Sequence, residues 1–223
     1  DGQLTQREQW LERGHAEAIL PMVDALLGEA GIRLSSLDAI AFGRGPGAFT
    51  GVRLAASVTQ GLAFAARLPV VPVSDLQALA QRCLDEDRAV GRVLACADAR
   101  MHEVYWACFE RASEGMARAH GDEQVGRPSD VHLPGGWESR GPPDARPAST
   151  SGQLAGVGSG FAAYPELRTA LVLDALRADL LPRAAEIARL ALPAVVAGRF
   201  VEPEQALPVY LRDDVIRAPP KSS

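Results

Sequence analysis

The sequence predicts an α/β fold. Strand-like apolar runs at residues 37–42 and 68–73 are each followed by a helical pattern, the order typical of parallel strands joined by helices. Two further strand-like runs, 92–97 and 103–109, flank a short turn and predict an antiparallel pair. The chain has 223 residues, of which 47% are hydrophobic, so it can bury the core of one large domain or two small ones.

The first helix is expected at residues 15–27. Apolar side chains recur there at three- and four-residue spacing, as on one face of an amphipathic helix. Gly28 and Gly31 close the pattern. The apolar positions are Ile19, Leu20, Val23, Leu26 and Leu27.

Residues 43–53 form the most informative stretch, because four glycines and one proline lie within its first nine residues. The strand at 37–42 precedes this glycine run, and a helix at 52–66 follows it. Strand, glycine loop and helix in this order present free backbone N–H groups to an anion or to an approaching chain.

The next strand, at 68–73, carries prolines that mark its ends or an edge position. Ser74 or Asp75 is expected to cap a third helix, at residues 76–84.

The later part of the chain is less regular. Residues 126–152 are rich in Pro, Gly and Ser and predict a loop, with a short element near 130–133. A helix is expected at 180–196, and a strand or extended segment at 208–212.

The change of pattern at residues 85–91 suggests two lobes. We expect an N-terminal lobe at 1–91 and a C-terminal lobe at 92–223.

Composition argues against several classes of protein. The net charge of −5 and the pI of about 5.4 argue against a broad basic surface for nucleic acid. Cys83, Cys96 and Cys108 have no CxxC spacing, and the last two are expected to be buried. No apolar stretch approaches the roughly 20 residues needed to cross a bilayer, and no signal peptide is recognised, so a reducing, cytoplasmic setting is expected.

Metal and hydrolase chemistry find little support. The histidines His15, His102, His120 and His132 form no HxxxH or HExxH pair, so no metal site is expected. Ser159 lies in a glycine cluster that lacks the GxSxG pattern and is expected to be a turn residue.

The glycine run has competing interpretations. A Walker A loop is excluded, because Val52 follows Gly51 where a lysine is needed. A dinucleotide fingerprint fits in part, although Pro46 removes one N–H donor from the loop. That match uses Gly43, Gly45, Ala48 and Asp75, and the weak candidates for cofactor binding are Gly43, Gly45 and Gly47.

A third interpretation concerns the helix at 52–66, which carries small residues on more than one side. Packing on its own sheet accounts for one face, and a partner helix could occupy another. Both arrangements stay open at this point.

Asp98 and Glu103 flank the turn of the antiparallel pair. Paired carboxylates can perform acid–base chemistry, but turn capping by Asp98 and a solvent-facing Glu103 are favoured.

These motifs, in their order along the chain, resemble the TsaB family, also called YeaZ. The hallmark is the glycine run, with Ala48 where the family usually has Ser, followed by Gln60-Gly61-Leu62-Ala63. Matching segments recur at 97–105, 156–160 and 208–212. The motif residues are Gly43, Arg44, Gly45, Pro46, Gly47, Phe49, Thr50, Gly51, Arg53, Asp98 and Arg100.

The resemblance implies the two-lobed, ribonuclease H-like fold of actin, Hsp70 and sugar kinases. It also implies a non-catalytic partner of TsaD, assisted by the ATPase TsaE, in making N6-threonylcarbamoyladenosine at position 37 of tRNAs that read ANN codons. Homodimers are expected in isolation, and tRNA is expected to be contacted only through the complex. No cofactor of its own is implied, and ATP or ADP would bind only at the partner interface.

The resemblance further implies a four-helix contact made by the helices at 15–27 and 52–66 with TsaD or a second copy. The expected contact residues are His15, Ile19, Met22, Leu26, Val52, Ala55, Ala56, Thr59 and Gly61.

One departure and two alternatives accompany this interpretation. Family members begin with a strand and a phosphate-loop hairpin, whereas Asp1-Gly2 already resembles the turn within it, so the first lobe is expected to lack leading strands. The alternative is a nucleotide-dependent enzyme, an NAD-dependent dehydrogenase or a kinase-like phosphotransferase, that uses the loop at 43–48. The histidine inventory argues against a metalloprotease.

Overall fold

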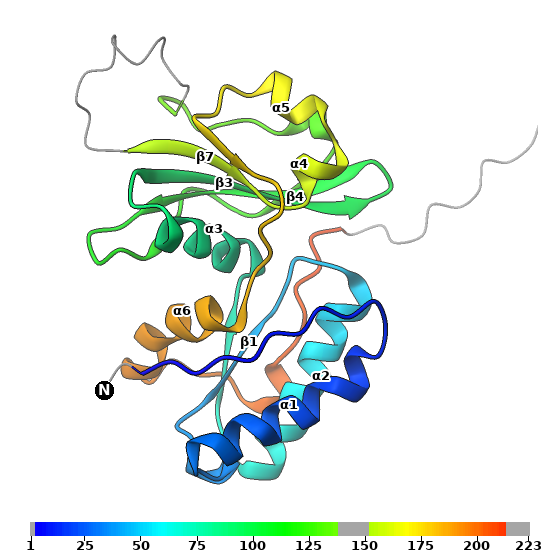
Figure 1. Cartoon of the computed structure of the whole chain (residues 1–223), viewed down its shortest axis with the longest axis vertical. Helices are drawn as coiled ribbons and strands as arrows, with labels where there is room; N and C mark the ends of the chain where they lie inside the picture. The colour runs from blue at the N-terminus through cyan, green and yellow to red at the C-terminus, as the bar shows by residue number, and fades with distance from the viewer. Residues whose placement is uncertain (1–2, 138–151, 213–223) are drawn as a thin grey trace, which may run out of the picture.

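The computed structural model describes residues 3–137 and 152–212, which form two lobes stacked along the long axis (Figure 1). The α/β fold expected from the sequence is confirmed. The second lobe contains the larger of the two sheets, and the first lobe contains the smaller one.

The first lobe is built on a parallel pair, which is the whole of this sheet in the described residues. Strand β1 (Ile40–Gly43) pairs with β2 (Val70–Val73), and α2 (Phe49–Ala66) connects them. Apolar residues on one face of the pair pack against α2, and those on the other face pack against α6 (Ala184–Val196). Helix α1 (His15–Ala30) faces α2 across a cavity that both helices line (Figure 1).

The second lobe is built on a mixed sheet, six-stranded within the part of the chain described, with β5, β4, β3, β7 and β8 in order and β6 also pairing with β4. The long central hairpin of β3 and β4 is antiparallel, as predicted. The bounds are β3 (Val90–Arg100), β4 (Glu103–Arg111), β5 (Ala117–Ala119), β6 (Gln124–Gly126), β7 (Gln153–Val157) and β8 (Ala175–Arg177).

Alternation along β3 divides the core of this lobe into two layers. Val93 and Ala95 pack toward α3 (Asp75–Glu86), whereas Leu94 and Cys96 pack toward α4 (Gly160–Ala163) and α5 (Glu166–Ala170). Short 3-10 turns complete the chain: η1 (Leu34–Ser36), η2 (Pro128–Asp130) and η4 (Pro203–Gln205).

The chain crosses between the lobes more than once, which a single boundary near residue 91 does not describe. Helix α3 packs on the sheet of the second lobe, although it was expected in the segment 1–91. Helix α6 packs back against the first sheet. After it, Val201 forms an antiparallel bridge with Val70 of β2.

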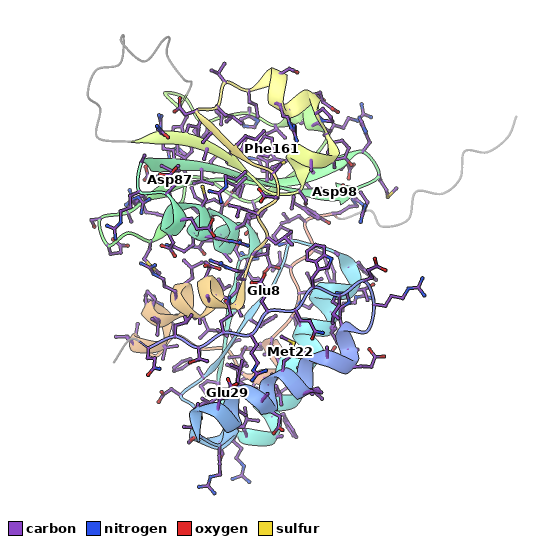
Figure 2. The ribbon with its side chains drawn as sticks, in the orientation of Figure 1. Glu8, Met22, Glu29, Asp87, Asp98 and Phe161 are labelled. Carbon is purple, nitrogen blue, oxygen red and sulfur yellow. The ribbon has the colours of Figure 1, made fainter. Side chains whose placement is uncertain are left out.

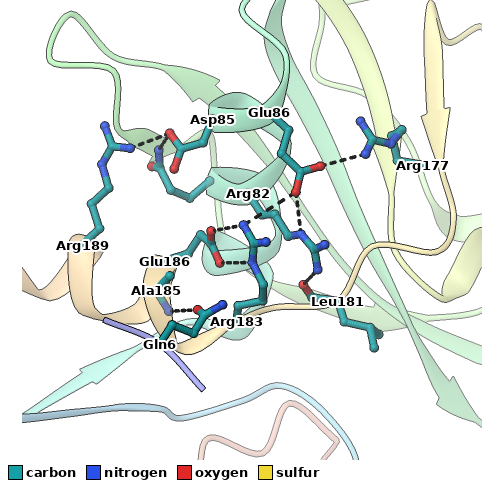
Figure 3. Close-up of polar contacts among 11 residues, drawn as sticks. Gln6, Arg82, Asp85, Glu86, Arg177, Leu181, Arg183, Ala185, Glu186 and Arg189 are labelled. Carbon is teal, nitrogen blue, oxygen red and sulfur yellow. Dashed lines mark hydrogen bonds and ion pairs between the residues drawn. The ribbon is translucent and has the colours of Figure 1, made fainter. Parts of the chain in front are cut away.

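Ion pairs of α3 reach α6 of the first lobe and β8 of its own lobe (Figure 3). Glu86 accepts from Arg177 at 2.8 Å and from Arg82 at 2.9 Å, and Asp85 pairs with Arg189 at 2.7 Å. Because α6 belongs to the first lobe and α3 to the second, the Asp85–Arg189 pair links them directly.

Candidate functional site

The glycine run forms a closed turn at the junction of the lobes. The Gly45 N–H donates to Asp75 Oδ2 at 3.0 Å, and the Asp75 N–H donates back to the Gly45 carbonyl at 3.0 Å. The Arg44 N–H donates to the Val73 carbonyl at 2.8 Å. These N–H groups are therefore already satisfied, and the loop does not present them to a phosphate.

Sterics explain why glycine occupies two positions of this turn. A Cβ on Gly43 would stand 2.0 Å from Asp75 Oδ1, so a side chain there would displace the carboxylate. Gly45 has a φ of +95°, a conformation that favours glycine. The glycines thus allow Asp75 to approach the strand end closely.

Asp75 has an unusual electrostatic environment. Burial raises its pKa from 3.8 to about 6, and the Glu123 carboxylate acts in the same direction. The hydrogen bond from Gly45 and the charge of Arg44 oppose this rise in pKa.

Glu123, between β5 and β6, connects the second lobe to this turn. It pairs with Arg44 at 3.1 Å and accepts a short hydrogen bond from the Ser74 hydroxyl. Ser74 is also the N-cap of α3, since its Oγ accepts from the Gln77 N–H at 3.0 Å. The predicted cap is confirmed, and it has a second role between the lobes.

The extended segment expected at 208–212 lies along the same junction. The Val209 N–H donates to the Arg44 carbonyl at 2.8 Å, and Arg212 donates to the Ala99 carbonyl at 3.2 Å and pairs with Glu103. This segment therefore contacts the glycine run of one lobe and the hairpin turn of the other.

The hairpin turn after β3 is held in a left-handed conformation, with φ values of 63°, 54° and 60° at Arg100, Met101 and His102. Asp98 stabilises the turn by accepting from the Arg100 N–H at 2.8 Å and from the Tyr164 hydroxyl at 3.0 Å. Turn capping by Asp98 is thus confirmed.

Two details accompany this turn. Glu103 is less exposed than expected, because Arg212 pairs with it. Ser159 accepts from the Asp98 N–H at 3.1 Å, as a turn residue would.

The residues expected to contact a partner differ in how exposed they are within this chain. Val52, Ala56 and Thr59 are buried within their own lobe, so they are not available to a partner. Ile19, Met22 and Leu26 are half-buried and line a cavity of about 820 Å³ between α1, α2, β1 and α6. The burial of Val52, Ala56 and Thr59 argues against their contact with a partner. Contact through the α1 residues, among them Met22 (Figure 2), stays a prediction, because they are half-buried around the cavity.

The outward faces of α1 and α2 are the exposed alternative. His15 and Gly61, which were expected at the partner contact, are exposed, and Ala55 is half-buried. The outward residues of each helix recur at three- and four-residue spacing, whereas the prediction relied on the apolar and small positions. The outward residues are Glu17, Leu20, Pro21 and Asp24 on α1, and Thr50, Arg53, Ser57, Gly61 and Phe64 on α2.

Other chemistry finds no support in the part of the chain described. No group of three or more His, Cys, Asp or Glu side chains there is arranged to hold a metal ion. The three cysteines are buried, and burial raises their thiol pKa values to about 11 for Cys83 and about 12 for Cys96 and Cys108. No described helix is long and apolar enough to cross a membrane.

Comparison with known proteins identifies the family. A family model described as TsaD, tRNA N6-adenosine threonylcarbamoyltransferase, matches residues 9–213. The tRNA threonylcarbamoyladenosine biosynthesis protein TsaB of Escherichia coli is 39% identical over 217 residues, which cover 96% of this chain and 88% of the relative. The chain belongs to the TsaB family.

Relatives and solved structures agree with this assignment. TsaB of Haemophilus influenzae is 49% identical over 106 residues, 48% of this chain and 44% of the relative. A crystal structure of a Pseudomonas aeruginosa protein similar to peptidase YeaZ has a TM-score of 0.78 at 48% identity, covering 89% of this chain and 84% of that one. A second structure, YeaZ from Pseudomonas aeruginosa, has a TM-score of 0.77 at 46% identity, covering 91% and 87%.

Membership of the TsaB family also bears on the alternatives for the glycine run. In a dinucleotide site Asp75 would reach a ribose, whereas here it accepts from the loop backbone. The interpretation as a TsaB-type protein is supported over that of a dehydrogenase or phosphotransferase.

Proposed function

We propose that this TsaB-family chain is a non-catalytic scaffold subunit that binds a TsaD subunit for N6-threonylcarbamoylation of adenosine 37 in tRNAs reading ANN codons. The observation that carries the proposal is the pair of outward stripes on α1 and α2, which are exposed along two adjacent helices. In this proposal TsaE joins the assembly, tRNA is contacted through the complex, and the chain forms a homodimer when alone.

The outward stripe of α2 suits close helix packing. Ser57 and Gly61 are small, no atom outside the adjoining helix backbone lies within 4 Å of a Cβ built on Gly61, and Phe64 is 72% exposed beside them. Small residues one turn apart let a second helix approach, and an exposed aromatic side chain adds apolar contact area. ATP or ADP, where it acts, would bind at the interface so formed.

The test is the affinity of the purified chain for purified TsaD. Gly61→Arg places a long side chain in the contact without touching the core, so we expect affinity to fall roughly tenfold or more. Ala163→Arg on the exposed side of α4 is the matched control and should leave affinity unchanged. Unaltered binding by Gly61→Arg would refute the contact.

A second measurement tests the role itself. Adding the chain to TsaD, TsaC and TsaE should restore tRNA modification, and the chain alone should modify no tRNA.

A further inference from the structure

Arg53 is held in a fixed position on the outward stripe of α2. Its Nε donates to the Tyr210 hydroxyl at 2.8 Å, and its guanidinium carbon lies 3.6 Å from the centroid of the Phe49 ring. The two rings are 6.0 Å apart, and Phe49 and Tyr210 are 49% and 46% exposed. An exposed arginine is thus clamped by two exposed aromatic residues from distant parts of the chain.

Arg53 differs from the other arginines of the lobe junction. Arg44, Arg100 and Arg212 each pair with a carboxylate, those of Glu123, Asp98 and Glu103 respectively, which lie close by in the fold. Within residues 3–137 and 152–212, no carboxylate lies within ion-pair distance of Arg53. An arginine that is already ordered loses little rotamer freedom on binding, so its planar fork is prepared for a carboxylate.

The outward stripe of α1 carries the opposite charge. Glu17 and Asp24 are exposed on it, with Leu20 between them 50% exposed. Neither carboxylate has a basic partner in the described parts of the chain. One copy of this chain therefore offers both halves of an ion pair, on the two adjacent helices proposed to bind a partner.

A nucleic acid is a poorer match for Arg53. Its neighbouring arginines are neutralised by carboxylates, and the whole chain has a net charge of −5. Proteins that bind nucleic acid through phosphates use several unpaired cations at once, whereas arginine and aromatic residues together are typical of protein interface centres.

We propose that Arg53, clamped by Phe49 and Tyr210, is the charged anchor of self-association, and that it pairs with Glu17 or Asp24 of the partner subunit. This inference rests on the proposed function, since it names the residue that fixes the helix contact between two copies. Ion pairs of this kind set the register and choice of partner more than the affinity.

Charge reversal tests the inference, with self-association of the full chain followed by sedimentation velocity. Arg53→Glu should weaken the dimer roughly tenfold or more, because like charges then face each other across the contact. Glu17→Arg with Asp24→Arg should weaken it similarly, and the three changes together should restore most of the affinity. Arg33→Glu, at an exposed position beyond α1, is the matched control and should change nothing.

A smaller change tests the clamp itself. Tyr210→Phe keeps the ring and removes the acceptor of the Arg53 Nε bond, so we expect a few-fold loss, in the range of one hydrogen bond. A monomeric wild-type chain, an unaffected Arg53→Glu variant, or a triple variant without recovery would overturn the proposal.

Two further outcomes distinguish the Arg53 pairing from RNA binding and from the scaffold function. If Arg53→Glu abolishes binding of a fluorescent anticodon stem-loop RNA and leaves self-association intact, the surface serves RNA and the inference is wrong. If Gly61→Arg abolishes TsaD binding while charge reversal fails to restore self-association, the scaffold function stands and only the Arg53 pairing fails.

Discussion

The two lobes differ in how completely they bury their apolar residues. In the second lobe Leu94, Leu154 and Phe161 are fully buried on one side of a sheet with six described strands. In the first lobe the sheet has two described strands, and α1, every residue of which keeps some exposure, lines a cavity of about 820 Å³. We therefore expect the second lobe to be the more stable part of the fold, and the first lobe carries the helices proposed to bind a partner.

The largest expected effect compares the same substitution in the two lobes. Phe161 is fully buried, and Phe161→Ala should lower the free energy of unfolding by about 3–5 kcal/mol. Phe64 on α2 is 72% exposed, and Phe64→Ala should change that free energy by less than about 0.5 kcal/mol. Urea unfolding of both variants measures the difference, and equal losses would contradict the contrast between the lobes.

Asp75, at the junction of the lobes, gives a pH-dependent effect of intermediate size. Its pKa of about 6 in the folded chain exceeds its ordinary value of 3.8, because burial disfavours the carboxylate. The folded state therefore holds a proton that the unfolded state releases, and the contribution of Asp75 to stability falls as the pH rises from about 4 to 6.

Asp75→Asn isolates this contribution, since the amide oxygen can still accept from the Gly45 N–H while the titration is removed. Relative to the variant, the wild-type chain should lose about 1–3 kcal/mol of unfolding free energy between pH 4 and pH 7. Thermal unfolding across this range checks the difference. Parallel pH profiles of the two chains would show that the pKa of Asp75 is not raised in the folded state.

The order of elements along the chain was predictable, because it depends on local patterns. Periodicity predicted a helix at 15–27, which the structure extends to Ala30. The hairpin turn lies between the two strand-like runs, as their spacing predicted. Helix α2 begins at Phe49, earlier than predicted, because the last residues of the glycine run are themselves helical.

The parts that could not be predicted depend on contacts distant in sequence. Asp75 closes the glycine run through two hydrogen bonds with Gly45, and Glu123 reaches the same turn from the other lobe. The inward and outward faces of α1 and α2 could not be distinguished either, since Ala and Gly suit both a sheet and a partner helix. The sequence marks Arg53 only as a motif residue, because the Tyr210 hydroxyl that accepts from it is distant in sequence.

The smallest expected effect concerns the coupling between the lobes. Glu86 of α3 pairs with Arg82 and Arg177, and Arg183, at the start of α6, approaches it at 3.6 Å. All these side chains keep partial solvent access, so Glu86→Gln should cost only about 0.5–1 kcal/mol. The loss should shrink at high salt, which screens such pairs.

This variant also tests whether the lobes unfold as one unit. Trp106 and Trp137 are buried in the second lobe, so tryptophan fluorescence follows mainly that lobe, whereas far-ultraviolet circular dichroism follows both. We expect the two unfolding midpoints to coincide in the wild-type chain and to separate in Glu86→Gln. In the variant, the circular dichroism midpoint should lie at the lower denaturant concentration, because α1, α2 and α6 lie in the less buried lobe. Glu110→Gln, which breaks a pair with Arg118 inside the second sheet, is the matched control and should leave the midpoints together. Coincident midpoints in both variants would mean that the Asp85–Arg189 pair and the apolar contact of α3 with α6 couple the lobes without Glu86.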